Sequence, residues 1–174
     1  MSREDASRGC NQAPQSARRV SFRVPHAQSL RAEPAEVGFS HIALTVRNAA
    51  TSIDFYSRYA GMEVVHERGE FGKRVVWLSD LSRPFAIVLI EVEEVEGRLS
   101  GIAHLGTSCA SAEEVDRLCA LAEQEDHLIL GPSDDGPPVG YWALLRDPDG
   151  HNLELSYGQQ VALTVGTARS RHPD

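Results

Sequence analysis

Two histidines and two glutamates recur at matched spacing along this 174-residue chain. His41 and Glu91 are 50 positions apart, as are His104 and Glu154, so a single offset of 63 positions relates the two pairs. Imidazole and carboxylate groups together are ligands of borderline divalent metal ions. If the four side chains meet in one cleft, the sequence predicts a site for Zn, Ni, Co, Mn or Fe(II).

The sequence around these residues repeats as well. Residues 38–42 (GFSHI) match residues 101–105 (GIAHL), and residues 89–92 (LIEV) match residues 152–155 (NLEL). A repeat at a fixed period indicates copies of one structural unit. We therefore expect two modules, each with a histidine on its first strand and a glutamate on its last.

Alternation along the strands predicts which way these residues point. Side chains two positions apart share a face of a strand, so His41 lies opposite Ile42, and Glu91 lies opposite Ile90. The simplest arrangement is a curved sheet with helices on its convex side and the four polar residues on its concave side. The alternative is that they are ordinary exposed residues on an open sheet face.

Several motifs accompany this pattern. They are the segment around His41, the helix pattern 52–56 (SIDFY), the run 61–65 (GMEVV) and the segment 147–155 (DPDGHNLEL). With these motifs the chain resembles the vicinal oxygen chelate superfamily, which includes glyoxalase I, extradiol dioxygenases and bleomycin resistance proteins. The resemblance covers about residues 37–158.

The resemblance implies an α+β fold. Two βαβββ modules, residues 37–93 and 101–158, would form a cupped, mostly antiparallel sheet around a divalent metal ion, with helices on the convex side. Superfamily members often dimerise, so the resemblance implies a homodimer, and the two modules of one cup belong either to one chain or to two.

By the same resemblance, His41, Glu91, His104 and Glu154 would be the metal ligands of a glyoxalase-like lyase or isomerase. A substrate with neighbouring oxygens would chelate the metal, which acts as a Lewis acid. Glu154 would carry a proton between adjacent carbons, with Glu91 opposite it. Trp77, Trp142 and Arg74 are candidate contacts for this small-molecule substrate.

Three alternatives remain open at this stage. An Fe(II) extradiol-type dioxygenase needs only two histidines and one carboxylate. A metal-free protein of the bleomycin resistance type would bind a drug in the cup. Four protein ligands can also close a purely structural zinc site.

Composition and charge restrict the partners. The net charge is −8, although the terminal segments 1–36 and 159–174 are basic, so residues 37–158 are strongly acidic, which argues against a nucleic-acid partner. No apolar run reaches the ~18 residues of a membrane span. We expect residues 1–36 to be a loosely ordered extension, residues 159–174 to be a tail, and the protein to be cytoplasmic.

Overall fold

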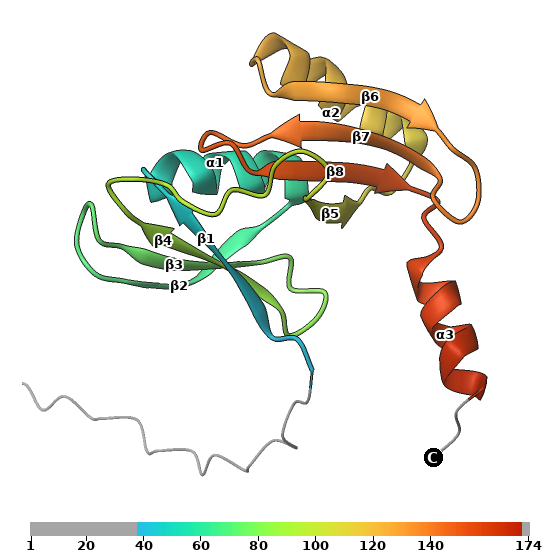
Figure 1. Ribbon diagram of the computed structural model, residues 1–174, viewed down its shortest axis with the longest axis horizontal. Helices are drawn as coiled ribbons and strands as arrows, with labels where there is room; N and C mark the ends of the chain where they lie inside the picture. Colours follow the sequence, from blue (N-terminus) through green and yellow to red (C-terminus); the bar gives the residue numbers. More distant parts are fainter. Residues whose placement is uncertain (1–37, 172–174) are drawn as a thin grey trace, which may run out of the picture. The chain divides into compact units, whose positions relative to one another are not determined.

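The structure is a computed structural model that describes residues 38–171. The predicted extension at residues 1–36 lies outside the described residues. The chain forms two βαβββ modules followed by a third helix (Figure 1). The two modules expected from the repeat and the α+β architecture implied by the resemblance are therefore confirmed.

Each module contributes one four-stranded sheet. The first sheet has the order β1-β4-β3-β2 and the second has the order β5-β8-β7-β6. In each sheet the first and last strands of the module pair in parallel and the other pairs are antiparallel. The strands are β1 (His41–Val46), β2 (Glu63–Arg68), β3 (Val75–Ser79), β4 (Ala86–Glu91), β5 (Leu105–Ser108), β6 (Leu128–Asp134), β7 (Tyr141–Arg146) and β8 (Asn152–Tyr157).

Each module also carries one long helix between its first two strands. In α1 (Ala49–Ala60) the side chain of Asn48 accepts the N–H of Ala50 at 2.9 Å, the usual role of a residue that caps a helix start. The helix ends at Gly61, whose φ of 61° lies in the left-handed region that glycine adopts without strain. In α2 (Ala112–Gln124) Ser111 has the same capping role.

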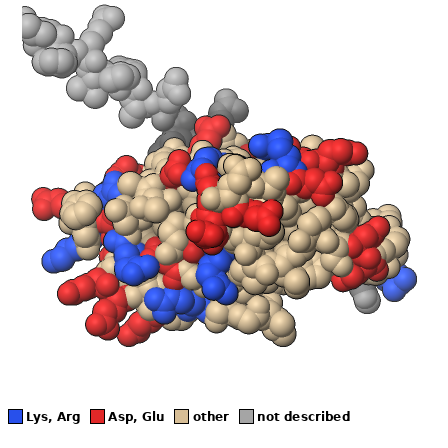
Figure 2. Space-filling view, turned by 90° about the horizontal axis from the view of Figure 1, so that it is seen from above, with Lys and Arg blue, Asp and Glu red and all other residues tan. Residues whose placement is uncertain are grey.

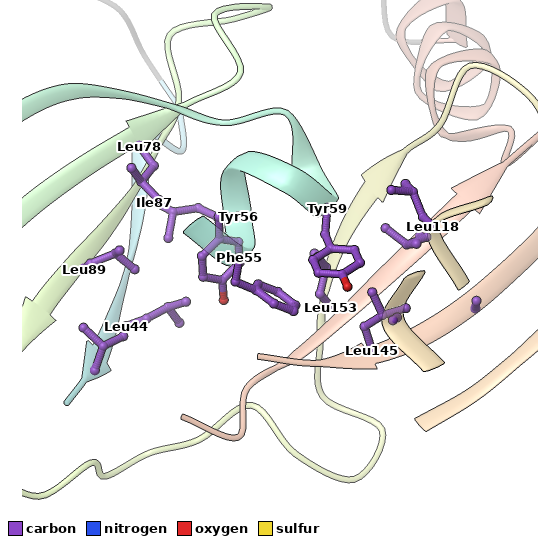
Figure 3. Close-up of a cluster of buried hydrophobic side chains, with 14 of the residues drawn as sticks. Leu44, Phe55, Tyr56, Tyr59, Leu78, Ile87, Leu89, Leu118, Leu145 and Leu153 are labelled. Carbon is purple, nitrogen blue, oxygen red and sulfur yellow. The ribbon is translucent and has the colours of Figure 1, made fainter. Parts of the chain in front are cut away.

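One hydrophobic core joins the two modules through α1. Phe55, Tyr56 and Tyr59 are at most 2 % exposed and belong to the same buried cluster as residues of both sheets. Figure 3 shows these rings between Leu89 of the first sheet and Leu145 of the second. Burying one large apolar side chain stabilises the folded state by about 1.5–3 kcal/mol. Because these three rings are buried between the two sheets, α1 is an apolar link between the modules.

A buried polar junction adds to this link. The hydroxyl of Tyr56 donates to Asp147 at 3.1 Å, and Arg47 donates to Asp149 through both its backbone N–H and its Nε. Burial, followed by the charge of Asp147, raises the pKa of Tyr56, which keeps its hydroxyl protonated as a donor.

His151 completes the junction from the same turn. Its Nε2 lies 2.9 Å from the carbonyl oxygen of Thr45, and its Nδ1 lies 3.2 Å from the backbone N of Leu99. Both ring nitrogens are therefore satisfied when Nε2 carries the proton. The turn that contains Asp147 and Asp149 thus fixes the second module to the first.

The third helix, α3 (Val161–Arg171), has no buried residue. It occupies most of the segment expected to be a tail. Within residues 38–171, no helix has the length and apolar character needed to cross a bilayer.

Replacing Tyr56 with Phe tests the polar junction. The change removes one donor from the buried Asp147 carboxylate, so we expect it to lower the free energy of unfolding by about 1–3 kcal/mol. Urea denaturation measures this loss. The matched control is Tyr157→Phe at an exposed position, and equal midpoints for the two variants would contradict the assigned role of Tyr56.

Candidate metal centre

His104 and Glu154 are brought together by the second sheet. His104 immediately precedes β5, and Glu154 on β8 pairs with Gly106, two residues further on, so the three residues share one face. The Nε2 of His104 lies 3.3 Å from Oε2 of Glu154. This pair is the part of the predicted site that the structure assembles.

The hydrogen bonding of His104 orients its free nitrogen. Its Nδ1 lies 2.8 Å from the carbonyl oxygen of Ile102, so Nδ1 carries the proton and donates. The lone pair of Nε2 then faces an oxygen of the Glu154 carboxylate. Two acceptors this close require a proton or a cation between them.

The separation also suits a metal. Ligand bonds of 2.0–2.2 Å place adjacent N and O ligands about 3.0–3.4 Å apart, and the observed distance is 3.3 Å. A histidine whose other nitrogen donates to a backbone carbonyl is the common arrangement in metal sites. The donor types and their geometry therefore fit a divalent ion.

His41 lies on the face of the first sheet that points away from the hydrophobic core, here termed the concave face. Its ring is exposed, and its Nδ1 lies 3.0 Å from the Ser40 hydroxyl. Within residues 38–171 of one chain, no three His, Cys, Asp or Glu side chains are close enough to share a metal. A single chain does not bring His41 to the pair formed by His104 and Glu154.

Glu91 points the other way, toward the helix side. It shares its face of β4 with Leu89, which is fully buried in the core. Its carboxylate accepts the N–H groups of Ala49 at the start of α1, Gly72 and Arg74, and also the guanidinium of Arg74. The prediction that Glu91 faces the concave side is wrong.

The sheet register explains this error. Ala43 pairs with Val88 on the first sheet just as Gly106 pairs with Glu154 on the second. Ala43 to Gly106 is 63 positions, but Val88 to Glu154 is 66, so the matched spacing of the histidine–glutamate pairs does not mark equivalent places. The counterpart of Glu154 is Val88, which is not a metal ligand.

The three candidate substrate contacts separate in the structure. Trp77 lines a hollow together with His41, and it is 44 % exposed. Trp142 shares a face with Glu154, and its indole N–H donates to Asp135 at 2.9 Å. Arg74 is occupied by Glu91 and by Glu67.

Arg68 lines the same hollow as His41, a position that its place in the sequence does not indicate. Because Arg68 pairs with Val75 across the sheet, its placement depends on the strand register. Strand alternation alone does not distinguish Arg68 from the other charged residues near it in the sequence.

Comparison with known proteins gives the family. The family model described as the Glyoxalase/Bleomycin resistance protein/Dioxygenase superfamily matches residues 38–155. The chain belongs to this superfamily. An uncharacterized protein of Pseudomonas aeruginosa is 33% identical over 125 residues, which cover 70% of this chain and 89% of that protein.

Two further proteins are similar to this chain, one in sequence and one in fold. A trivalent organoarsenical cleaving enzyme of a Bacillus species is 29% identical over 140 residues, 78% of this chain and 80% of that enzyme. The fold is similar to that of a fosfomycin resistance protein of Listeria monocytogenes, solved as a mutant in complex with Mn(II) and a dihydroxypropylphosphonic acid. That match has a TM-score of 0.57 and 18% identity, and it covers 75% of this chain and 97% of that chain.

The electrostatics of Glu91 give a prediction. Burial alone would raise the pKa of this carboxyl, but the donors from Ala49, Arg74 and Gly72 outweigh it and lower the pKa to about 2 from an ordinary 4.5. We expect Glu91→Gln to lower the free energy of unfolding by roughly 3 kcal/mol, because it leaves buried donors without a charged acceptor.

The pH dependence of this loss follows from the depressed pKa. The stabilisation by ionised Glu91 is complete above pH 4.5 and is lost as the pH falls toward 2. Urea denaturation between pH 7 and pH 3 should therefore show the difference between wild type and Glu91→Gln shrinking with acid. The control is Glu67→Gln, which removes the exposed partner of Arg74 and should cost under about 1 kcal/mol. A pH-independent difference would contradict the assigned ionisation.

Proposed function

We propose that the protein is a divalent-metal-dependent enzyme whose centre consists of His41, His104 and Glu154. The observation that carries the proposal is the His104–Glu154 pair, in which Nε2 of the imidazole faces a carboxylate oxygen at 3.3 Å while Nδ1 lies against a backbone carbonyl. On the face of the molecule seen in Figure 2, Lys and Arg are interspersed among Asp and Glu.

The centre is completed by two copies of the chain. In this proposal His41 of one copy meets His104 and Glu154 of the other, so a homodimer holds two equivalent sites. The concave faces that would meet expose large apolar side chains, including Trp77 at 44 % and Leu130 at 56 %. Exposed apolar surface of this kind is typical of an interface or a ligand site.

Each residue has a distinct role in the chemistry. A metal bound here would act as a Lewis acid on a substrate that offers two neighbouring oxygens. The two histidines and Glu154 hold the ion and leave coordination positions for the substrate. Glu154 is also the base that can take or return a proton, and Gln159 donates to its other oxygen at 3.2 Å, which fixes the carboxylate.

Because Glu91 lies outside the proposed centre, the centre has one carboxylate instead of two, and this affects which reactions it can support. A lyase or isomerase that depends on a second carboxylate opposite Glu154 loses support, because Glu91 lies on the helix side. A second candidate is therefore an Fe(II)-dependent dioxygenase, since two histidines and one carboxylate are its usual ligand set. The 29% identical organoarsenical cleaving enzyme supports bond cleavage as the reaction class.

Metal binding by single variants tests the centre. We expect the purified protein to bind Mn(II), Co(II) or Fe(II), and the substitutions His41→Ala, His104→Ala and Glu154→Ala each to weaken binding by about 100-fold or more. Isothermal titration with each metal measures this. Glu91→Gln is the control and should keep wild-type affinity in its folded fraction; strong metal binding by His104→Ala would refute the proposed centre. Oxygen uptake that requires both Fe(II) and a catechol then separates the dioxygenase from a lyase.

Mixing two inactive variants tests the pairing between copies. In a heterodimer of His41→Ala and Glu154→Ala chains, one site carries both substitutions and the other carries neither. We therefore expect the mixture, refolded together, to recover about a quarter of the wild-type metal capacity. Each variant refolded alone is the control. No recovery despite subunit exchange would show that each site is formed within one chain or not at all.

A further inference from the structure

A hollow on the concave face of the first sheet is apolar in its floor and cationic at one edge. Its volume is about 370 Å³, within the range of small-molecule sites. His41 lies on edge strand β1 and Arg68 lies on the opposite edge strand, β2. The floor between them consists of Ala43, Val75, Trp77, Ala86, Val88 and Ile90.

The register of the sheet sets this arrangement. Arg68 pairs with Val75, and Val75 pairs with Ile90, so the arginine lies at the end of an aliphatic row. In the next row His66 pairs with Trp77, and the two rings contact each other edge to face at a centroid distance of 5.1 Å. The indole is thus packed on one side and lines the hollow on the other.

Arg68 differs from the neighbouring Arg74 in its partners. Arg74 forms ion pairs with Glu67 and Glu91. Among residues 38–171 no Asp or Glu forms an ion pair with Arg68, and the lining of the hollow includes neither residue type. Arg68 is exposed, so in a domain this acidic its guanidinium, at the edge of an apolar floor, can pair with an external anion.

We infer that the hollow binds an apolar organic anion, with its charged group on Arg68 and its apolar body on Trp77. The inference rests on the proposed function in one respect only: the neighbouring oxygens that chelate the metal lie at the end of the substrate nearest His41. The substrate is then a compact organic acid with a metal-chelating group at one end and an anionic group at the other.

A matched pair of probes tests this inference. Benzoate and benzamide have the same ring and similar size, but only benzoate is charged. The indole N–H signals in ¹H–¹⁵N spectra report binding, with the Trp77 signal assigned through Trp77→Phe. The titrations use metal-free protein in excess chelator, so neither probe can bind through an ion.

We expect benzoate to shift the Trp77 signal with an affinity about tenfold or more above that of benzamide, as a charge-assisted hydrogen bond predicts. Arg68→Gln should remove this preference and leave both probes at the benzamide level. Arg83→Gln, in the neighbouring hollow where Arg83 lies over the ring of Phe85, should retain it. Equal affinities in the wild type, or loss of the preference in Arg83→Gln, would overturn the inference.

The same experiment separates this inference from the metal centre. His104→Ala, which does not alter the lining of the hollow, should keep the benzoate preference although it loses metal. A protein that binds benzoate through Arg68 but binds no metal would sink the proposed centre and leave the anion site standing. A protein that binds metal but shows no preference for benzoate over benzamide would overturn the anion site and leave the proposed metal centre standing.

Discussion

A buried carboxylate must be matched by hydrogen-bond donors or a cation, and this requirement organises both halves of the protein. Glu91 meets it with the backbone N–H at the start of α1 and the guanidinium of Arg74. Glu154 has a histidine nitrogen and one amide donor in front of it. The Glu91 carboxylate is therefore fully hydrogen-bonded within its own module, whereas the Glu154 carboxylate can still coordinate a cation.

The two modules are therefore structural repeats with different chemistry. The first supplies His41, an apolar floor and Arg68, whereas the second supplies the His104–Glu154 pair. In the proposed centre, neither concave face holds all three ligands. Large apolar side chains are exposed on both faces, which agrees with the proposed pairing of two copies.

The contacts that join the two modules lie on the opposite side of the sheets. The aromatic residues of α1 pack between the modules, and the buried turn around Asp147 and His151 bonds to the first module. These contacts hold the modules by their helix sides. The concave faces are consequently free of the contacts that maintain the fold, which suits surfaces used for binding.

The sequence by itself determined that there are two repeated modules and that His104 and Glu154 lie on the less apolar faces of their strands, because repeat and alternation depend on local periodicity; the order of strands and helices followed from the family resemblance. It did not determine where Glu91 points. That depends on a register difference of three positions between the modules, and on the donors that α1 and Arg74 bring to β4. Only the tertiary structure decides such matters, because strand register and the partners of a buried charge come from segments far apart in the chain.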